Sequence, residues 1–298
     1  MAWTSPAARA VWLPRIERIQ TAWRAIERES VVERIRDCAI VTLDGVELVE
    51  RAQGLLRRGV HVLPFQRTLA TPDVYQSGVP QPVDGAPSLF RVVIGAADAL
   101  SRFQRAWDDA DDDAIGALLG YPGCCRAAFR LVWRDLGLRD PTWLMAGGLV
   151  GPDETRDCLE VDGSPETNVL ARFIGVRAVP HLPCHFLCEP SAALGRLLCG
   201  VGAAHGFAEE MVWLRQILAW PYEWSALHGI AEIRTPVLKV AVASDATAVK
   251  YIVRLTGSAY PDEAAAGIGF PYRMRGSTSR GQPFRAEAGD ALTSGGTG

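Results

Sequence analysis

Apolar residues recur at roughly helical spacing between residues 5 and 36, with charged residues between them. Ile16, Ile19 and Trp23 fall on one side of such a helix, where they can pack against a core. The pattern therefore predicts one or two amphipathic helices in this segment.

A β-α-β unit is predicted next. The apolar run 38–43 has the length and composition of a strand, and Asp44 can cap a helix that continues to about Arg58. Gly59 can close this helix, and residues 60–63 form a second short strand.

Strands and helices alternate again further along. We expect a buried strand at 89–94, a helix at 96–107 and, after a run of aspartates, a short helix at 114–119. Acidic side chains favour the positive end of a helix dipole, so we interpret the aspartates as a solvated helix start rather than a cation site.

The last part of the chain contains both element types. Residues 190–219 are predicted to be helical, and residues 237–243 and 249–255 to pair as a β-hairpin. After about residue 275 the chain is rich in Gly, Ser and Thr without periodicity, which predicts a disordered tail. The expected fold is mixed α/β: a small central sheet flanked by helices, a C-terminal β-hairpin and the tail.

Prolines and glycines concentrate at residues 64–87, which marks a candidate boundary. We therefore predict an N-terminal helical and β-α-β segment at 1–87, a cysteine-motif core domain at 88–274 and a disordered tail at 275–298.

Composition narrows the classes of function. The chain has 298 residues, is 48% hydrophobic and carries a net charge of −3. Without a basic surplus, the charge favours neither nucleic acid nor an anionic membrane as a partner. No apolar stretch reaches the roughly 18 residues that a membrane span needs, and we find no secretory signal. We expect a soluble, cytoplasmic protein.

The chain has seven cysteines, an odd number that favours thiols or metal ligands over disulfides. Four stand in two pairs, each at a predicted helix start: Cys124 with Cys125, and Cys184 with Cys188. Pro122 suits the opening turn of the first helix and Pro190 that of the second. Helix N-termini favour the thiolate, which is the form that binds zinc or iron. We therefore expect the two helix starts to meet and hold four sulfurs.

Several occupants of such a site remain open. Adjacent cysteines do not easily chelate one zinc ion with relaxed geometry, whereas the separated irons of a cubane let them reach different corners. This favours an iron–sulfur cluster, with zinc as the alternative. The other interpretations are a dithiol redox pair and four small buried apolar side chains. Cys38 and Cys199 are expected to serve packing, and Cys158 to lie in a loop.

Three residues are candidate catalytic groups. His181 is close enough to Cys184 to bind the metal or carry protons, and His185 is a weaker candidate. His228 and Glu232 would share a face of a helix as an acid–base or metal pair. The competing interpretation is a buried network in which Glu232 pairs with a nearby arginine.

Three arginines are candidate anion-binding residues: Arg126, Arg177 and Arg234. Their planar guanidinium groups can bind a carboxylate or phosphate with two hydrogen bonds. The competing interpretation is that these arginines lie near the other candidate residues only by chance, because arginines are numerous in the chain. The usual nucleotide-binding glycine loops, the G-x-S-x-G elbow and the H-E-x-x-H helix are absent from the sequence.

Two segments carry a resemblance. Residues 119–125, Leu-Gly-Tyr-Pro-Gly-Cys-Cys, and residues 181–191, His-x-Pro-Cys-x-x-x-Cys-x-x-Ser, resemble prokaryotic domain families with an L-G-Y-P-x-C-C motif and a later H-x-P-C-x-x-x-C. The resemblance covers roughly residues 88–275. Those families have no established activity, so it implies one shared cysteine site and no reaction.

Two hypotheses of function follow. The first is an iron–sulfur enzyme that performs redox or sulfur chemistry on a small molecule, anionic if the arginines bind it. Such a site is closed if four cysteines bind, and has an open position if three bind. The second is a non-catalytic binding or regulatory protein, with a protein partner, in which zinc joins two helix starts.

Overall fold

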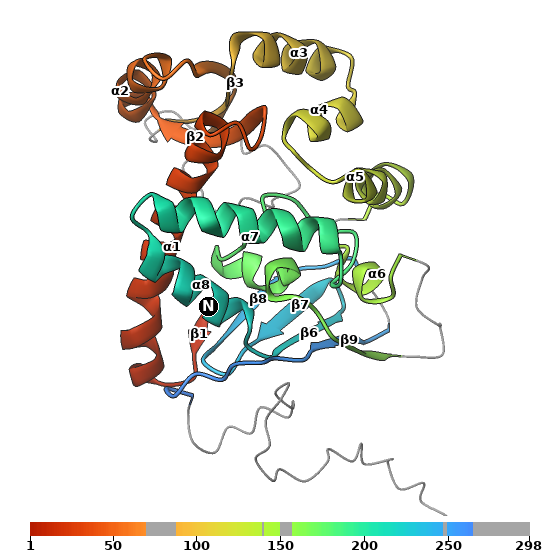
Figure 1. Cartoon of the computed structure of the whole chain (residues 1–298). Coiled ribbons are helices and arrows are strands. Elements are labelled where there is room, and N and C mark those ends of the chain that lie inside the picture. The colour runs from red at the N-terminus through yellow and green to blue at the C-terminus, as the bar shows by residue number, and fades with distance from the viewer. Residues whose placement is uncertain (70–87, 139, 150–156, 247–248, 265–298) are drawn as a thin grey trace, which may run out of the picture.

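The computed structural model describes residues 1–69, 88–138, 140–149, 157–246 and 249–264 (Figure 1). These residues form a six-stranded sheet, in the order β1-β8-β7-β6-β9-β5, and a three-stranded sheet, in the order β2-β4-β3. Each sheet with the helices packed on it is here called a unit. The long helix α1 (Pro6–Val32) runs along the unit of the six-stranded sheet and reaches the unit of the three-stranded sheet. The predicted mixed α/β class is confirmed.

The six-stranded sheet is antiparallel except where β5 pairs with β9. Its strands are β1 (Ala2–Trp3), β5 (Cys158–Val161), β6 (Tyr222–Leu227), β7 (Ile230–Arg234), β8 (Leu238–Ala243) and β9 (Tyr251–Leu255). Successive side chains of a strand point to opposite faces of the sheet, so every second residue faces the core. Trp224 and Ala226 on β6, and Ala231 and Ile233 on β7, belong to this core.

Helices cover this buried face (Figure 1). They are α1, α6 (Thr142–Ala146), η2 (Pro165–Thr167), η3 (Val169–Ile174), α7 (Glu189–Ala204) and α8 (Ala208–Leu218). The N-terminal segment forms one continuous helix, capped by the Ser5 side chain. It buries Trp12, Ile19 and Ile26 completely, at the helical spacing that the sequence predicts.

The three-stranded sheet contains the predicted β-α-β unit. Its strands are β2 (Cys38–Asp44), β3 (His61–Leu69) and β4 (Ser88–Gly95). Helix α2 (Gly45–Leu56) connects β2 to β3, and β4 lies between these strands and runs antiparallel to both. Asp44 and Glu47 form a reciprocal capping box at the start of α2.

A short helical segment leads from this sheet toward α7. It consists of α3 (Ala97–Asp108), α4 (Asp112–Leu118), α5 (Gly123–Phe129) and the π-helix η1 (Arg130–Asp135). Helices α3 and α4 pack with one face of the three-stranded sheet, in a core that includes Phe103 and Leu118. This core is separate from the main core under α1, α7 and α8.

The pairing of the two last strands differs from the prediction. Strands β8 and β9 form where alternation predicts them, but β8 pairs with β7 and β1, while β9 pairs with β6 and β5. The hairpins are instead β6–β7 and β7–β8, because short turns at residues 228–229 and 235–237 join these neighbouring strands.

Two predictions about chain organisation are not tested by the structure. The tail from residue 275 lies outside the described residues. The boundary at 87/88 stays a prediction, although β4 pairs with strands from the N-terminal side of it. In the described part of the chain, none of the helices has the length and apolar character needed to cross a membrane.

Candidate metal centre

The four predicted cysteines converge. The sulfur atoms of Cys124, Cys125, Cys184 and Cys188, here called the cysteine group, all lie within 4.8 Å of one another. Cys124 Sγ is 3.8 Å from Cys125 Sγ and 3.7 Å from Cys188 Sγ, and the sulfurs of Cys125 and Cys188 are 3.6 Å apart. Four thiols gathered so closely could hold a metal ion.

Two helix starts hold three of the sulfurs, as predicted, whereas Cys184 lies in the loop before the second helix. Cys124 and Cys125 occupy the first turn of α5, which begins after Pro122. Cys188 is the N-cap residue of α7, whose first turn contains Pro190. Gly120, with a φ of +75°, turns the chain between α4 and α5.

The loop that carries Cys184 and Cys188 is fastened to the main core. Thr167 donates its hydroxyl hydrogen to the carbonyl of Phe186, and the backbone N–H of Ser164 donates to the same carbonyl. The Phe186 side chain is 2% exposed and belongs to the main core. The cysteine group therefore lies where α5 meets a loop that is anchored in the main core, under the six-stranded sheet.

Burial divides the four cysteines. Cys125, Cys184 and Cys188 are 3%, 5% and 1% exposed, whereas Cys124 is exposed. The three buried cysteines and Ala128 form a small apolar cluster of their own. Cys124 is therefore the cysteine of the group that a reagent in solution reaches most easily.

The electrostatics of the buried thiols is uneven. Burial raises the pKa of the Cys125 thiol to about 12 and raises the pKa of Cys184 still further. Burial acts on Cys188 too, but hydrogen bonds from Ser191 and from neighbouring thiols outweigh it and hold its pKa below the usual value. Among the buried thiols of the group, Cys188 therefore loses its proton most readily, and a bound divalent ion would favour thiolates throughout.

His181 lies beside the group but contacts it through another residue. Its Nε2 atom is 2.8 Å from Ser191 Oγ, which is 3.1 Å from Cys125 Sγ. Its ring packs against Tyr121, with centroids 4.9 Å apart. Burial and, to a lesser extent, the positive charge of Arg36 lower the pKa of His181 to about 3. The imidazole is therefore neutral at pH 7.

His228 and Glu232 do not lie on a helix. His228, with a φ of 51°, and Gly229, with a φ of 77°, are the two turn residues of the β6–β7 hairpin. Among the described residues, Glu232 pairs with Arg234 and lies 3.6 Å from Lys239. The helical face that would join His228 to Glu232 does not form, because the residues around the turn alternate with a period of two.

The three candidate anion-binding arginines each contact a carboxylate of the chain. Arg126 pairs with Asp113 at 3.0 Å, Arg177 with Glu27 at 3.0 Å, and Arg234 with Glu232. Arg126 also donates to the carbonyl of Tyr121, in the segment before Cys124. These pairs give each guanidinium a local partner, and anion binding stays a prediction.

The remaining candidates are placed as follows. His185 Nδ1 accepts a hydrogen bond from the backbone of Leu187, which serves the loop itself. Cys38 and Cys199 are buried in two separate apolar cores, as predicted, and Cys158 begins strand β5.

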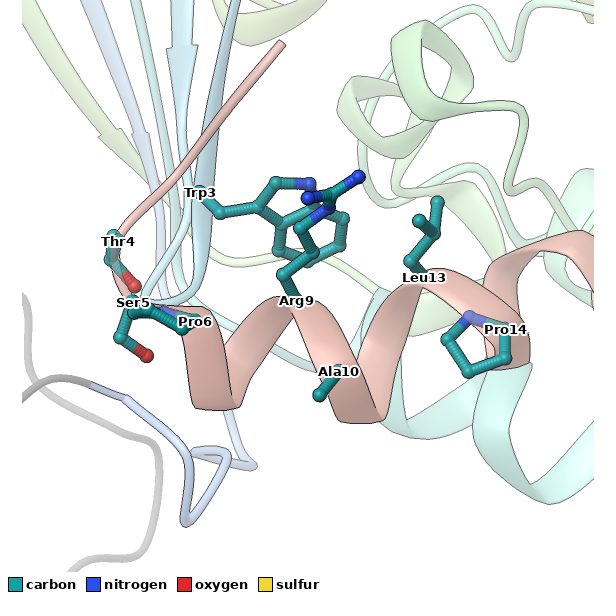
Figure 2. Close-up of a pocket in the computed structure, with 8 residues that line it drawn as sticks. All are labelled: Trp3, Thr4, Ser5, Pro6, Arg9, Ala10, Leu13 and Pro14. Atoms are coloured by element: carbon teal, nitrogen blue, oxygen red, sulfur yellow. The ribbon is translucent and has the colours of Figure 1, made fainter.

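A hollow beside the first turns of α1 is lined by residues between Trp3 and Pro14, and it contains no predicted site residue (Figure 2).

Ser191 and Arg36 lie near the site, although the sequence predicts no role for either residue. Ser191 is fully buried and contacts both His181 and Cys125. Its position three residues after Cys188, in the first turn of a helix, is the signal that could have indicated it. Arg36 is distant in sequence, and only the packing of α1 brings it near His181.

Comparisons with protein-family models, with curated proteins and with solved structures found no match. The geometry of the cysteine group therefore carries the functional argument alone.

Proposed function

We propose that the cysteine group binds one zinc ion in a closed, four-thiolate site. Zinc bound by four cysteines is tetrahedral, with Zn–S distances of about 2.3 Å, so neighbouring sulfurs are about 3.8 Å apart. The contacts of 3.6, 3.7 and 3.8 Å in the group match that edge. This agreement is the observation that carries the proposal.

The same spacing favours one ion over the iron–sulfur cluster that the sequence favours. In a cubane each cysteine binds a different iron, and sulfides separate the irons, so the cysteine sulfurs lie farther apart than around a single ion. All four sulfurs here lie within 4.8 Å of one another. In this proposal the adjacent cysteines in the first turn of α5 share one ion.

The position of the site supports a structural role. Helix α5 continues from a unit with its own core, and the loop from Cys184 to Cys188 is anchored in the main core. A zinc ion between them joins the two units where apolar packing is sparse. Four thiolates also leave no position for a substrate. We therefore propose a zinc-stabilised binding or regulatory protein, whose partner is another protein.

The exposure of Cys124 favours a second candidate, the metal-dependent enzyme. If only the three buried cysteines bind, the ion has an open position toward solvent, where it can act as a Lewis acid on a small substrate. Arg126, one residue beyond the tandem pair, would then meet an anionic group, whereas the low pKa of His181 does not suit it to carry protons at neutral pH.

Metal analysis of protein purified without oxygen tests these proposals. We expect a colourless protein with one zinc per chain and four thiols protected from alkylation. Iron with acid-labile sulfide, or no metal, would overturn the zinc site. Replacing zinc with cobalt reports the ligands: intense visible absorption that weakens in Cys124→Ser supports four thiolates. Absorption that is unchanged in this variant supports the three-cysteine enzyme site. Cys199→Ser is the matched control.

A further inference from the structure

We infer that His181 and Ser191 are positioning residues that hold Cys125 as a thiolate ligand through a chain of hydrogen bonds. The inference rests on the proposed metal site and assigns its support. The chain runs from His181 Nε2 to Ser191 Oγ over 2.8 Å, and from Ser191 Oγ to Cys125 Sγ over 3.1 Å. His181 is 7% exposed, Ser191 is fully buried and Cys125 is 3% exposed.

The direction of this chain follows from its donors and acceptors. A thiolate has no hydrogen, so it can only accept. The single hydrogen of the Ser191 hydroxyl is donated along its short contact with Cys125 Sγ, while the backbone N–H of Ser191 can donate to Cys188. The hydroxyl oxygen then accepts a hydrogen from His181 Nε2. The neutral imidazole has its hydrogen on Nε2 in this state, and Nδ1 carries only a lone pair.

The surroundings of His181 agree with this tautomer. Nδ1 is buried and has no hydrogen-bond partner among the described residues. The opposite tautomer would bury an N–H group without an acceptor there, and orphaned buried N–H groups are rarer than unpaired acceptors. The buried cation of Arg36, close enough to act on His181, also opposes a second proton on the ring.

The tandem cysteines explain why one sulfur needs this support. Cys124 is exposed, so water can donate hydrogen bonds to its thiolate. Cys125 is the next residue but is buried, and a buried thiolate needs donors from the protein. The Ser191 hydroxyl supplies one, and His181 fixes the orientation of that hydroxyl.

Zinc affinity measured by competition with a chromophoric chelator tests the chain. We expect Ser191→Ala and His181→Phe each to bind zinc about tenfold more weakly, the usual effect of removing a partner that orients a ligand. Because both act through one hydroxyl, the double variant should bind no more weakly than either single one. His181→Gln, whose side-chain amide can donate in place of Nε2, should recover part of the affinity.

A matched control separates this effect from loss of packing. Thr235 is also buried, but its hydroxyl donates to the carbonyl of Leu238 in the turn between β7 and β8. Thr235→Val should therefore lower the melting temperature and leave the zinc affinity unchanged. The cobalt absorption of Ser191→Ala should also shift, because the donor to one thiolate has gone.

The outcomes distinguish this inference from the proposed function. If the wild-type protein does not bind one ion through four thiolates, the proposed function fails. If it does, but Ser191→Ala keeps wild-type affinity and absorption, only the inference fails. Additive losses in the double variant would also overturn it. Ser191→Ala keeps the test decisive even if His181→Phe does not fold, since alanine is well tolerated in a helix.

Discussion

Removing the metal from the cysteine group is expected to lower the free energy of unfolding by about 4 kcal/mol. The ion would join Cys125 to Cys188, which are 63 residues apart. If it stays bound on unfolding, closing a loop of that length removes about 14 cal/mol/K of chain entropy, or about 4 kcal/mol at 25 °C. If it dissociates, free metal at about a thousand times its Kd also stabilises the native state by about 4 kcal/mol. For a chain of this size the melting temperature should fall by about 10 °C.

Calorimetry on zinc-loaded and chelator-stripped protein, both with reductant, measures this difference. Cys188→Ser should melt like the stripped protein even in excess zinc. Cys199→Ser is the control, since Cys199 is 3% exposed on the same helix α7 but belongs to the main core. Its response to zinc should equal that of the wild type.

Hydrogen exchange locates the effect. Helix α5 contributes only Cys125 and Ala128 to an apolar cluster of buried residues, so its amides should lose protection first when zinc is removed. Amides of β6–β9 should keep theirs. The stripped protein could instead melt within about 2 °C of the loaded one, which corresponds to less than about 1 kcal/mol. That result would refute the idea that the ion stabilises the contact between the two units.

Three further predictions concern stability. Asp44→Ala should cost about 1 kcal/mol in urea unfolding, because the Asp44 carboxylate accepts from the backbone N–H of Glu47 at 2.7 Å. Glu29→Gln should cost at most about 1 kcal/mol at pH 7. Two hydrogen bonds from Arg58, 2.9 and 2.6 Å long, lower the pKa of Glu29, so this contribution is present above about pH 4.3 and is lost as the pH falls through the lower folded-state pKa. Urea titrations of both proteins across that range should therefore converge in acid. His228→Asn should raise stability by about 0.5 kcal/mol, since asparagine before glycine suits a turn with positive φ; thermal unfolding that shows a loss would contradict the turn argument.

The cysteine group is the part of the site that the sequence anticipated best. Proline is a local signal of a helix start: Pro122 is the N-cap residue of α5, and Pro190 lies in the first turn of α7. The expectation that adjacent cysteines do not easily chelate one zinc ion is an argument about local geometry, and it stays a prediction. The spacing of Cys188 from Cys124 and Cys125 depends instead on how two distant segments meet.

Much of the secondary structure was determined by the sequence itself. The helical period in α1, the capping box of α2 and the alternation in β8 and β9 are local patterns, and local backbone preferences produce them directly. Strand partners are not local: β8 and β9 both alternate, but β8 forms a hairpin with β7, and β9 pairs with β6 on the other side of the β6–β7 hairpin.

The tertiary structure alone decided which polar residues serve the cysteine group. Ser191 is near the cysteine group because the first turn of α7 faces α5. Arg36, which follows α1, comes close enough to His181 for its charge to act on the ring. Glu232 instead pairs with Arg234 across the surface of a sheet. Composition and spacing could name the chemically capable residues, but burial and hydrogen bonding depend on contacts between segments far apart in the chain, and these exist only once the fold has formed.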